Sequence, residues 1–280
     1  MASNNHPQIE FEIKPQSKFS IGLKELWEYR ELFYFFTLRD IKVKYKQTVL
    51  GFLWAVLQPL TMALLFSFFI GKAITNYTNM QTPYVVFALS GLVLWGIFSS
   101  GINNAGNSMV SNANIIKKIY FPRLIIPISA VLVGVFDFFM AFIVFIIFCF
   151  FNHVAFSWQS VIYFPVAVVL TSIATFGIGT FLAALNVKYR DFRYIIPFLV
   201  QFLLFLTPVI YPITITSNIY LKALMALNPM TAPLDLFRAG IGVGHINIMI
   251  DGLSVLSSLI LFLVGLVYFR KTEAYFADLA

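Results

Sequence analysis

Six long runs of apolar residues, separated by polar segments, divide the 280-residue chain. The runs lie at residues 50–71, 84–103, 124–151, 161–185, 195–213 and 252–269. Each run is 18 to 28 residues long, and a helix needs roughly 20 residues to cross a hydrocarbon core of about 30 Å. The pattern predicts an all-α membrane protein with six transmembrane helices.

Basic residues are distributed unequally between the two sides of these predicted spans. If the chain crosses a bilayer at each run, 16 of the 19 Lys and Arg residues fall on the side that holds both termini. The exceptions are Lys72, Lys222 and Arg238. Because loops rich in Lys and Arg stay in the cytoplasm, we expect a multi-pass protein with both termini cytoplasmic.

The composition supports this topology and argues against several other classes of protein. Hydrophobic residues make up 60% and charged residues 11% of the chain, far from the balance of a soluble domain. The net charge of +7 fits attraction to anionic membrane lipids better than binding of nucleic acid. The one cysteine, Cys149, lies in the third run, so neither a disulfide framework nor a cysteine metal site is expected.

Several motifs that would indicate other functions are missing from the sequence. The polar N-terminus has no apolar core of a signal peptide. The chain also lacks the Gly-x-x-x-x-Gly-Lys-Ser/Thr loop that binds nucleotide phosphates. We therefore expect no catalytic residues, no metal site and no cofactor in this chain.

The first 46 residues are predicted to lie outside the membrane core. Residues 1–18 are polar and are expected to form a flexible cytoplasmic tail. From Phe19 to Phe36, Trp27 and other apolar residues share one helix face, which predicts an amphipathic helix lying in the cytoplasmic interface. An amphipathic helix packed on protein would show the same pattern. This helix and the basic stretch after it form segment 19–46, and residues 47–280 form the six-span domain.

Two of the predicted spans contain irregular sequence. Pro59 predicts a kink in the first span, because proline removes a helix hydrogen bond. The fifth run ends in the broken sequence Thr207-Pro-Val-Ile-Tyr-Pro212. Residues 214–251 are too few and too interrupted for two more spans, so we expect one or two short re-entrant helices there. Asp251 is the predicted N-cap of the last span.

A basic stretch precedes the first span, and its side chains are predicted to bind the anionic headgroup of a lipid. It contains Arg39, Lys42, Lys44 and Lys46. The aromatic residues that follow could lie against the flat faces of sugars. For each charge taken singly, a membrane anchor that only satisfies topology is the simpler interpretation.

Two further segments on the same side carry charge. Residues 112–123 form a short amphipathic turn closed by Pro122, which is suited to docking into a cytoplasmic partner; a solvated loop is the alternative. The docking residues are predicted to be Ile115, Ile116, Lys117, Lys118, Ile119 and Tyr120. The second segment is a tight hairpin between the fourth and fifth spans, with Lys188, Arg190, Asp191 and Arg193.

Asp137 lies in the middle of the third run. A carboxylate in the membrane costs about 2.5–3.5 kcal/mol on insertion scales, so such residues face protein or a pathway. A proton relay would need further ionisable residues within the spans. We expect a structural hydrogen bond from Asp137 to Ser, Thr or Asn on a neighbouring span, or a protonated acid.

An ordered set of motifs resembles the permeases of polysaccharide-exporting type-2 ABC transporters. The stretch Lys44-Tyr-Lys-Gln-Thr-Val-Leu-Gly-Phe-Leu-Trp54, with Gln58-Pro59, is similar to the start of that family's first span. Further similar stretches are Ile116-Lys-Lys-Ile-Tyr-Phe-Pro-Arg123, Asn186-Val-Lys-Tyr-Arg-Asp191, Thr207-Pro-Val-Ile-Tyr-Pro212 and Asn228-Pro-Met230 with Phe237-Arg238. Each motif is weak alone, but together they occur in the family's order between about residues 33 and 276.

The resemblance implies the transmembrane subunit of a bacterial exporter. Two copies of the chain would form a homodimeric pore in the inner membrane, and two copies of a separate ATPase subunit would bind ATP and Mg. The implied substrate is a polyprenyl-pyrophosphate-linked polysaccharide. The amino-acid sequence at the start of the first span favours O-antigen. The alternatives are a teichoic-acid or capsule exporter of the same family, or a small-molecule or ion-coupled flippase.

This resemblance also implies how the parts would work together. Residues 112–123 would carry the motion of the ATPases into the spans, and residues 214–250 would gate the outer end. The first and fifth spans would line the pathway, where aromatic rings could pack on sugar rings. The candidate aromatic residues are Phe52, Trp54, Phe202 and Phe205. The alternative for each of them is a lipid-facing or helix-packing role.

Overall fold

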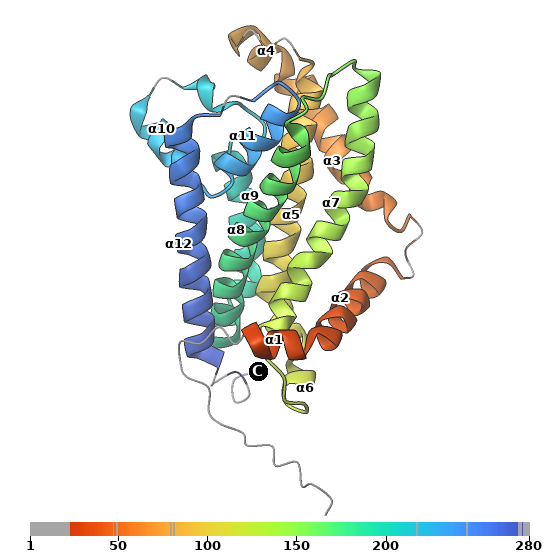
Figure 1. The fold of residues 1–280 in the computed structure, drawn as a ribbon, viewed down its shortest axis with the longest axis vertical. Coiled ribbons are helices and arrows are strands. Elements are labelled where there is room, and N and C mark those ends of the chain that lie inside the picture. The colour runs from red at the N-terminus through yellow and green to blue at the C-terminus, as the bar shows by residue number, and fades with distance from the viewer. Residues whose placement is uncertain are drawn as a thin grey trace, which may run out of the picture.

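The computed structural model describes residues 23–46, 48, 50–78, 80, 82–216, 218–244, 246–273 and 276. Every regular element among these residues is helical, as the apolar pattern predicted. The long helices run side by side and form a bundle (Figure 1). The predicted tail at residues 1–18 lies outside the described residues.

Five helices in the described part of the chain are long and apolar enough to cross a membrane. The first is the continuous helix Leu53–Thr78, in which a π-helical turn, Ser67–Gly71, joins α3 (Leu53–Phe66) to α4 (Lys72–Thr78). The others are α5 (Tyr84–Ser111), α7 (Ile125–Phe151), α8 (Ser160–Lys188) and α12 (Ile248–Glu273). Pro59 lies inside α3, and the π-helical turn follows it by about two turns.

The fifth predicted span is shorter than the other five. It is α9, Phe192–Leu206, a helix of 15 residues that is about 22 Å long at 1.5 Å per residue. The helix stops at Thr207, whose backbone is extended with ψ 141°, because the residue before a proline avoids the helical region. The six apolar runs are therefore all helical, but the fifth helix falls short of a full hydrocarbon core.

Small residues allow some of the long helices to approach closely. A Cβ atom added to Gly265 of α12 would lie 2.0 Å from the carbonyl oxygen of Gly177 of α8. A Cβ atom on Gly101 of α5 would lie 2.4 Å from the Thr175 side chain of α8. Glycine lets backbones pack together in this way inside a membrane, and α8 is thereby fixed between α5 and α12.

Two short helices follow α9, in agreement with the prediction for this region. They are α10 (Ile219–Ala226) and α11 (Thr231–Gly240). Most of α11 is buried, and it packs against α5, α8 and α12. The prediction that Asp251 is the N-cap of α12 is wrong. Asn247 caps the helix instead, because its side chain accepts hydrogen bonds from Met249 N (3.1 Å) and Ile250 N (3.3 Å). Asp251 lies one turn further on, and its carboxylate accepts from Asn247 N at 2.8 Å.

Arg238 of α11, assigned to a far-side loop by the charge count, is buried inside the bundle with only 1% of its surface exposed. Its guanidinium donates to the carbonyl oxygens of Pro208 (2.7 Å) and Val209 (2.5 Å) and lies 3.7 Å from the ring centroid of Phe87. These carbonyls belong to the turn after α9, where no helix supplies donors. Arg238 therefore stabilises the end of the short span.

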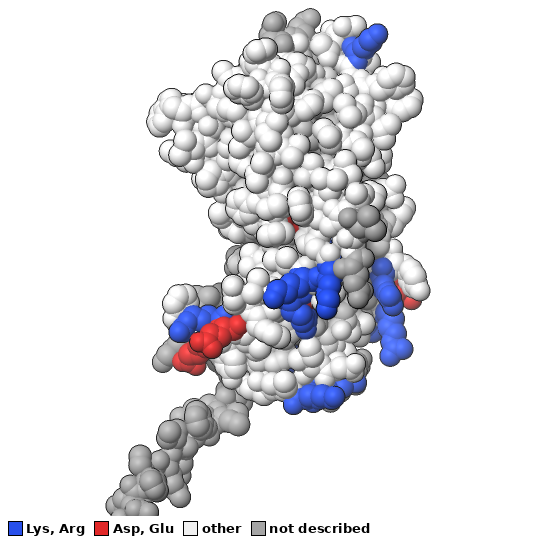
Figure 2. Space-filling model, turned by 90° about the vertical axis from the view of Figure 1, so that its right-hand side faces the viewer, with Lys and Arg blue, Asp and Glu red and all other residues white. Residues whose placement is uncertain are grey.

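The charged segments gather at one end of the bundle. Helices α1 (Leu23–Glu28), α2 (Arg30–Tyr45) and α6 (Ala113–Ile116) lie there, as does the C-terminal end of α12 (Figure 1). We call this the charged end, and the opposite end, with α4 and α10, the far end. Figure 2 shows Lys, Arg, Asp and Glu gathered towards the charged end, while most of the surface above it is uncharged.

The N-terminal helical region differs from the predicted single helix at residues 19–36. The helix breaks at Tyr29, and α2 then continues through the basic stretch to Tyr45. Phe36 is buried and packs on Phe121 with ring centroids 5.6 Å apart, while Trp27 and Tyr34 are 71% and 66% exposed. One side of α2 thus packs on protein, while Tyr34 of α2 and Trp27 of α1 remain open to the surroundings.

Candidate functional site

One face of α5 is polar within an otherwise apolar bundle. Its residues recur every three or four positions and fall within an arc of about 140° at 3.6 residues per turn. They are Ser99, Ser100, Asn103, Asn104, Asn107 and Ser111. We call these six residues the polar face of α5. Polar side chains within spans face a protein interior or a pathway, because contact with lipid leaves them unsatisfied.

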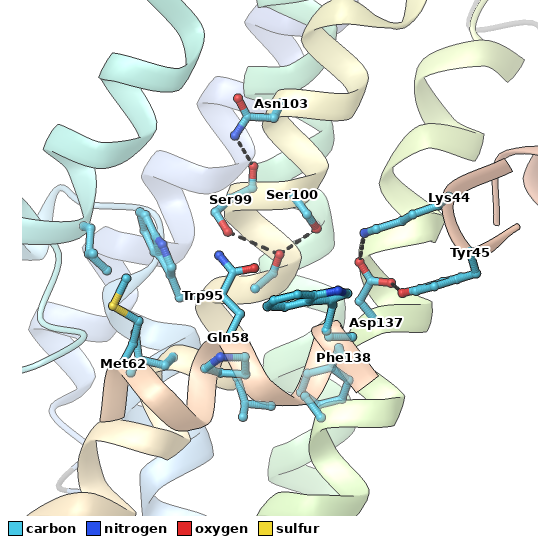
Figure 3. Close-up of a pocket in the computed structure, with 18 residues that line it drawn as sticks. Lys44, Tyr45, Gln58, Met62, Trp95, Ser99, Ser100, Asn103, Asp137 and Phe138 are labelled. Carbon is cyan, nitrogen blue, oxygen red and sulfur yellow. Dashed lines mark hydrogen bonds and ion pairs between the residues drawn. The ribbon is translucent and has the colours of Figure 1, made fainter. Parts of the chain in front are cut away.

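The polar face of α5 lines two cavities. The first has a volume of about 350 Å³ and lies among α2, α3, α5 and α7, with Trp54, Gln58 and Trp95 in its wall (Figure 3). The second has a volume of about 770 Å³, is open to the outside and lies nearer the charged end, against α2 and α6. Lys44 and Asn103 line both cavities, so the two are adjacent and form one polar track.

Asp137 of α7 meets α2 at this track. The ammonium of Lys44 and the hydroxyl of Tyr45 both donate to its carboxylate (Figure 3). The expected partner, a Ser, Thr or Asn on a neighbouring span, is therefore wrong, and the acid has an ionic partner that the sequence did not reveal. Burial and the hydrogen bond to Asp137 raise the pKa of the Tyr45 hydroxyl above its ordinary value. Tyr45 therefore remains a neutral donor at physiological pH.

The second basic residue of the track is also paired. Arg39 of α2 donates to the carboxylate of Asp40 at 2.7 Å and to the side-chain oxygen of Asn112 at 2.7 Å. Its guanidinium lies 4.6 Å from the ring centroid of Phe36. Arg39 thereby joins α2 to Asn112, the residue that directly follows α5.

The other two basic residues of the predicted headgroup site point elsewhere. Lys42 and Lys46 are exposed and line neither cavity. The structure therefore separates the four predicted cations into two that face the track and are ion-paired, and two that remain available to a membrane surface.

The polar face uses part of its hydrogen-bonding capacity on its own helix. Asn103 donates to Ser99 O and Asn107 donates to Asn103 O, both at 2.8 Å. The side-chain oxygen of Asn107 accepts from Asn186 of α8 at 3.1 Å. An amide has two donors and one acceptor oxygen, so Asn103 keeps one donor and its oxygen for other partners. The side chain of Asn104 has no hydrogen-bond partner among the described residues.

The four candidate aromatic residues do not share one location. Trp54 lines the first cavity. Phe52, Phe202 and Phe205 are 58%, 59% and 56% exposed on this single chain and line none of the cavities described above. The structure instead adds Trp95 of α5 to the cavity wall. Because Trp95 lies within a continuous apolar run, periodicity alone did not separate it from core residues.

The predicted docking segment, residues 112–123, lies at the charged end. Its apolar residues divide: Ile116 is buried with 6% exposed, while Ile119 and Tyr120 are 61% and 71% exposed. Ile115 is partly buried, and Lys117 and Lys118 are exposed. The three isoleucines therefore do not face one side, since Ile116 packs inward on the cluster that contains Phe36 and Phe121.

This docking segment is tied to two other elements. The backbone N–H of Arg123 donates to a Glu273 side-chain oxygen at 3.3 Å, and the Arg123 guanidinium donates to the Glu273 carbonyl. Phe121 packs on Phe36 of α2. The docking segment is therefore in direct contact with both α12 and α2.

The predicted hairpin lies at the connection between α8 and α9. Lys188, Arg190, Asp191 and Arg193 are all exposed there. The ammonium of Lys188 lies 4.9 Å from the ring centroid of Tyr189. None of the four lines the polar track, so the hairpin is a separate charged surface at the same end.

Comparison with known proteins decides the class of this bundle. The sequence pattern of the ABC-2 type transporter family matches residues 31–241, which include α2, the polar face of α5 and α11. The chain belongs to the ABC-2 type transporter family. It is therefore a membrane transport subunit, and the motif-based resemblance to this family is confirmed.

Individual relatives in this family are named as polysaccharide transport proteins. The O-antigen export system permease protein RfbA of Klebsiella pneumoniae is 30% identical over 244 residues, covering 87% of this chain and 92% of the relative. The protein of the same name from Myxococcus xanthus is 29% identical over 222 residues, covering 78% of this chain and 82% of the relative. The polysialic acid transport protein KpsM of Escherichia coli is 23% identical over 249 residues, covering 84% and 91%.

Proposed function

We propose that this ABC-2 subunit exports a polyprenyl-pyrophosphate-linked polysaccharide, of the O-antigen type, across the bacterial inner membrane. The polar track along α5 is the observation that carries the proposal, because a hydrophilic polymer needs polar contacts inside an apolar bundle. The choice of O-antigen rests on the similarity to RfbA, which is higher than the similarity to KpsM and covers nearly the full length of both chains.

Energy for transport comes, in this proposal, from a separate ATPase subunit that binds ATP and Mg. Two copies of the permease form the pore, with one ATPase bound to each. Ile119 and Tyr120 are the exposed residues through which the ATPase would act, since they project from a segment attached to α12 and α2. The charged end then faces the cytoplasm, as loops rich in Lys and Arg do.

A capsule exporter is the second candidate. The similarity to KpsM, which is named as a polysialic acid transport protein, extends over 84% of this chain. The two candidates share the ATPase partner and the direction of transport, and they differ only in the glycan.

Isolation of the complex tests the proposed function. We expect purification of the permease from its native membrane to yield an ATPase subunit, and a lipid-linked glycan to stimulate ATP hydrolysis by the complex in lipid nanodiscs. A variant of the ATPase without its phosphate-loop lysine serves as the control for background hydrolysis. Recovery of the permease without any ATPase would contradict the ABC exporter, and stimulation by a capsular glycan alone would favour the second candidate.

A further inference from the structure

The charges that line the polar track cancel. The two cavities are lined by two basic residues, Arg39 and Lys44, and by two acidic residues, Asp40 and Asp137. Each basic residue is paired with one of the acids. A phosphate or a sugar acid in the track would have to compete with a carboxylate already in place, so the residues that the structure describes offer an anion no spare cation in the track.

The remaining polar groups of the track are amides and hydroxyls. These groups both donate and accept hydrogen bonds, as the hydroxyl groups of a sugar do. Asn104 has no partner among the described residues, and Asn103 keeps a donor and an acceptor beyond its bond to Ser99. Asn103 and Asn107 lie one helical turn apart, about 6 Å along the axis, a spacing comparable to the length of one pyranose unit.

Two tryptophans complete the first cavity. Trp54 of α3 is 56% exposed, and Trp95 of α5 is almost buried. The flat C–H face of a pyranose can pack on an aromatic ring, which presents an apolar surface with a negative electrostatic face. Gln58 adds another amide between these rings and the polar face (Figure 3).

We propose that the polar face of α5, with Trp54 and Trp95, is a binding site for uncharged sugar units and disfavours polyanionic glycans. The inference rests on the proposed function and narrows its substrate to neutral polymers. It assigns the sugar contacts to Asn103 and Asn104 in particular, and it leaves the pyrophosphate end to exposed cations outside the track, such as Lys42 and Lys46.

Binding measurements on the full permease–ATPase complex in nanodiscs test this site. Three probes are compared: undecaprenyl pyrophosphate carrying a neutral oligomannose, the same lipid carrying an oligosialic acid, and the lipid without sugar. We expect the neutral glycan to bind at least about tenfold more tightly than the anionic one. Asn103→Ala with Asn104→Ala should weaken binding of the neutral glycan about tenfold and leave binding of the sugar-free lipid unchanged.

Asn152→Ala is the matched control variant. Asn152 is also a partly buried amide that donates to a carbonyl four residues earlier in its helix, at 2.8 Å, and it lines neither cavity. We expect this variant to bind all three probes as the unmodified protein does. If the double variant expresses poorly, Asn104→Ala alone is measured, because this side chain has no partner within the described part of the chain whose loss would weaken the fold.

Three results would overturn the inference while leaving the exporter intact. These are unchanged affinity of the double variant for the neutral glycan, equal or tighter binding of the anionic glycan, and loss of the permease dimer in the variant. The last would show that the polar face joins two copies of the chain. If no glycan bound or stimulated hydrolysis, the proposed function would fail as well.

Discussion

The two ends of the bundle hold buried charge in different ways. At the charged end, Lys44 reaches Asp137 beside a cavity, and 37% of the lysine side chain remains exposed. Towards the far end, Arg238 is almost completely buried, donates to the main-chain carbonyls of Pro208 and Val209, and lies over Phe87. A partly exposed ion pair is weak because solvent screens the attraction, whereas loss of a buried cation leaves its partners unsatisfied and is costly.

The difference suggests which parts of the protein move. The contacts of Arg238 join α11 to the end of α9, so any opening of the far end has to carry both elements as one body. The pairs at the charged end join α2 to α7 and to the residue after α5, and their partial exposure to solvent weakens them. The predictions below test this distinction.

The largest effect is expected from Arg238→Met. The variant keeps an unbranched apolar side chain but leaves the carbonyls of Pro208 and Val209 without donors, and it leaves Asp235 of the same helix without a nearby cation. Breaking a buried charged contact costs about 3–5 kcal/mol, so we expect a large loss of folded protein. Thermal unfolding in detergent and the yield of monodisperse protein measure it.

Arg190→Met is the control for this first prediction. Arg190 is exposed in the hairpin between α8 and α9, and its loss should leave the unfolding temperature within error. A similar unfolding temperature for both variants would show that the two ends do not differ in the way described.

A smaller effect is expected at the docking segment, from Ile119→Ser. Ile119 is 61% exposed, and burial of such a side chain against a partner contributes about 1.5 kcal/mol, or roughly tenfold in affinity. We expect weaker binding of the ATPase, measured by biolayer interferometry, with an unchanged unfolding temperature.

Ile248→Ser serves as the control, because Ile248 is 88% exposed at the start of α12, towards the far end. If Ile119→Ser left both ATPase binding and stimulated hydrolysis unaltered, the docking role of this segment would be wrong. An equal loss in the two variants would point to a general effect of removing surface apolar groups.

The Lys44–Asp137 pair is expected to contribute about 1 kcal/mol, because the lysine is partly exposed and solvent weakens the attraction. A double-mutant cycle of Lys44→Met, Asp137→Asn and the combined variant measures this coupling by thermal unfolding. Asp137→Asn alone should destabilise the protein, and the combined variant should recover part of the loss. Lys42→Met, two residues before Lys44 in α2 and exposed, should show no coupling to Asp137→Asn.

Much of the fold could be predicted from the sequence, because long apolar runs leave few alternatives. All six runs are helices, and the broken sequence from Thr207 ends α9 where predicted. The polar face of α5 was missed because the second run was ended at residue 103, whereas the helix continues to Ser111. The apolar run alone therefore does not place Asn104, Asn107 and Ser111 in the helix, although their spacing of three and four residues indicates one helix face.

The partners of the buried charges could not be predicted, because the fold brings together residues that are far apart along the chain. Lys44 and Asp137 are 93 residues apart, and the carbonyls bound by Arg238 lie 29 and 30 residues before it. Counting charges on each side of the membrane placed Arg238 in a loop, since that count treats every basic residue as exposed. Only the packing of α11 inside the bundle reveals the difference.

The smallest effect is expected among the aromatic residues, where sequence alone ranked four residues equally. Trp54→Ala should raise the glycan concentration for half-maximal stimulation of ATP hydrolysis two- to fivefold, because a lost aromatic contact costs about 0.5–1 kcal/mol. Phe202→Ala and Phe205→Ala should change it less than about twofold, since both rings lie outside the polar track of this chain. A larger effect of the two phenylalanines would place the glycan at a surface that two copies of the chain enclose. In that case the polar face of α5 would not be the main contact of the glycan, and the ion pairs at the charged end would not lie beside its path.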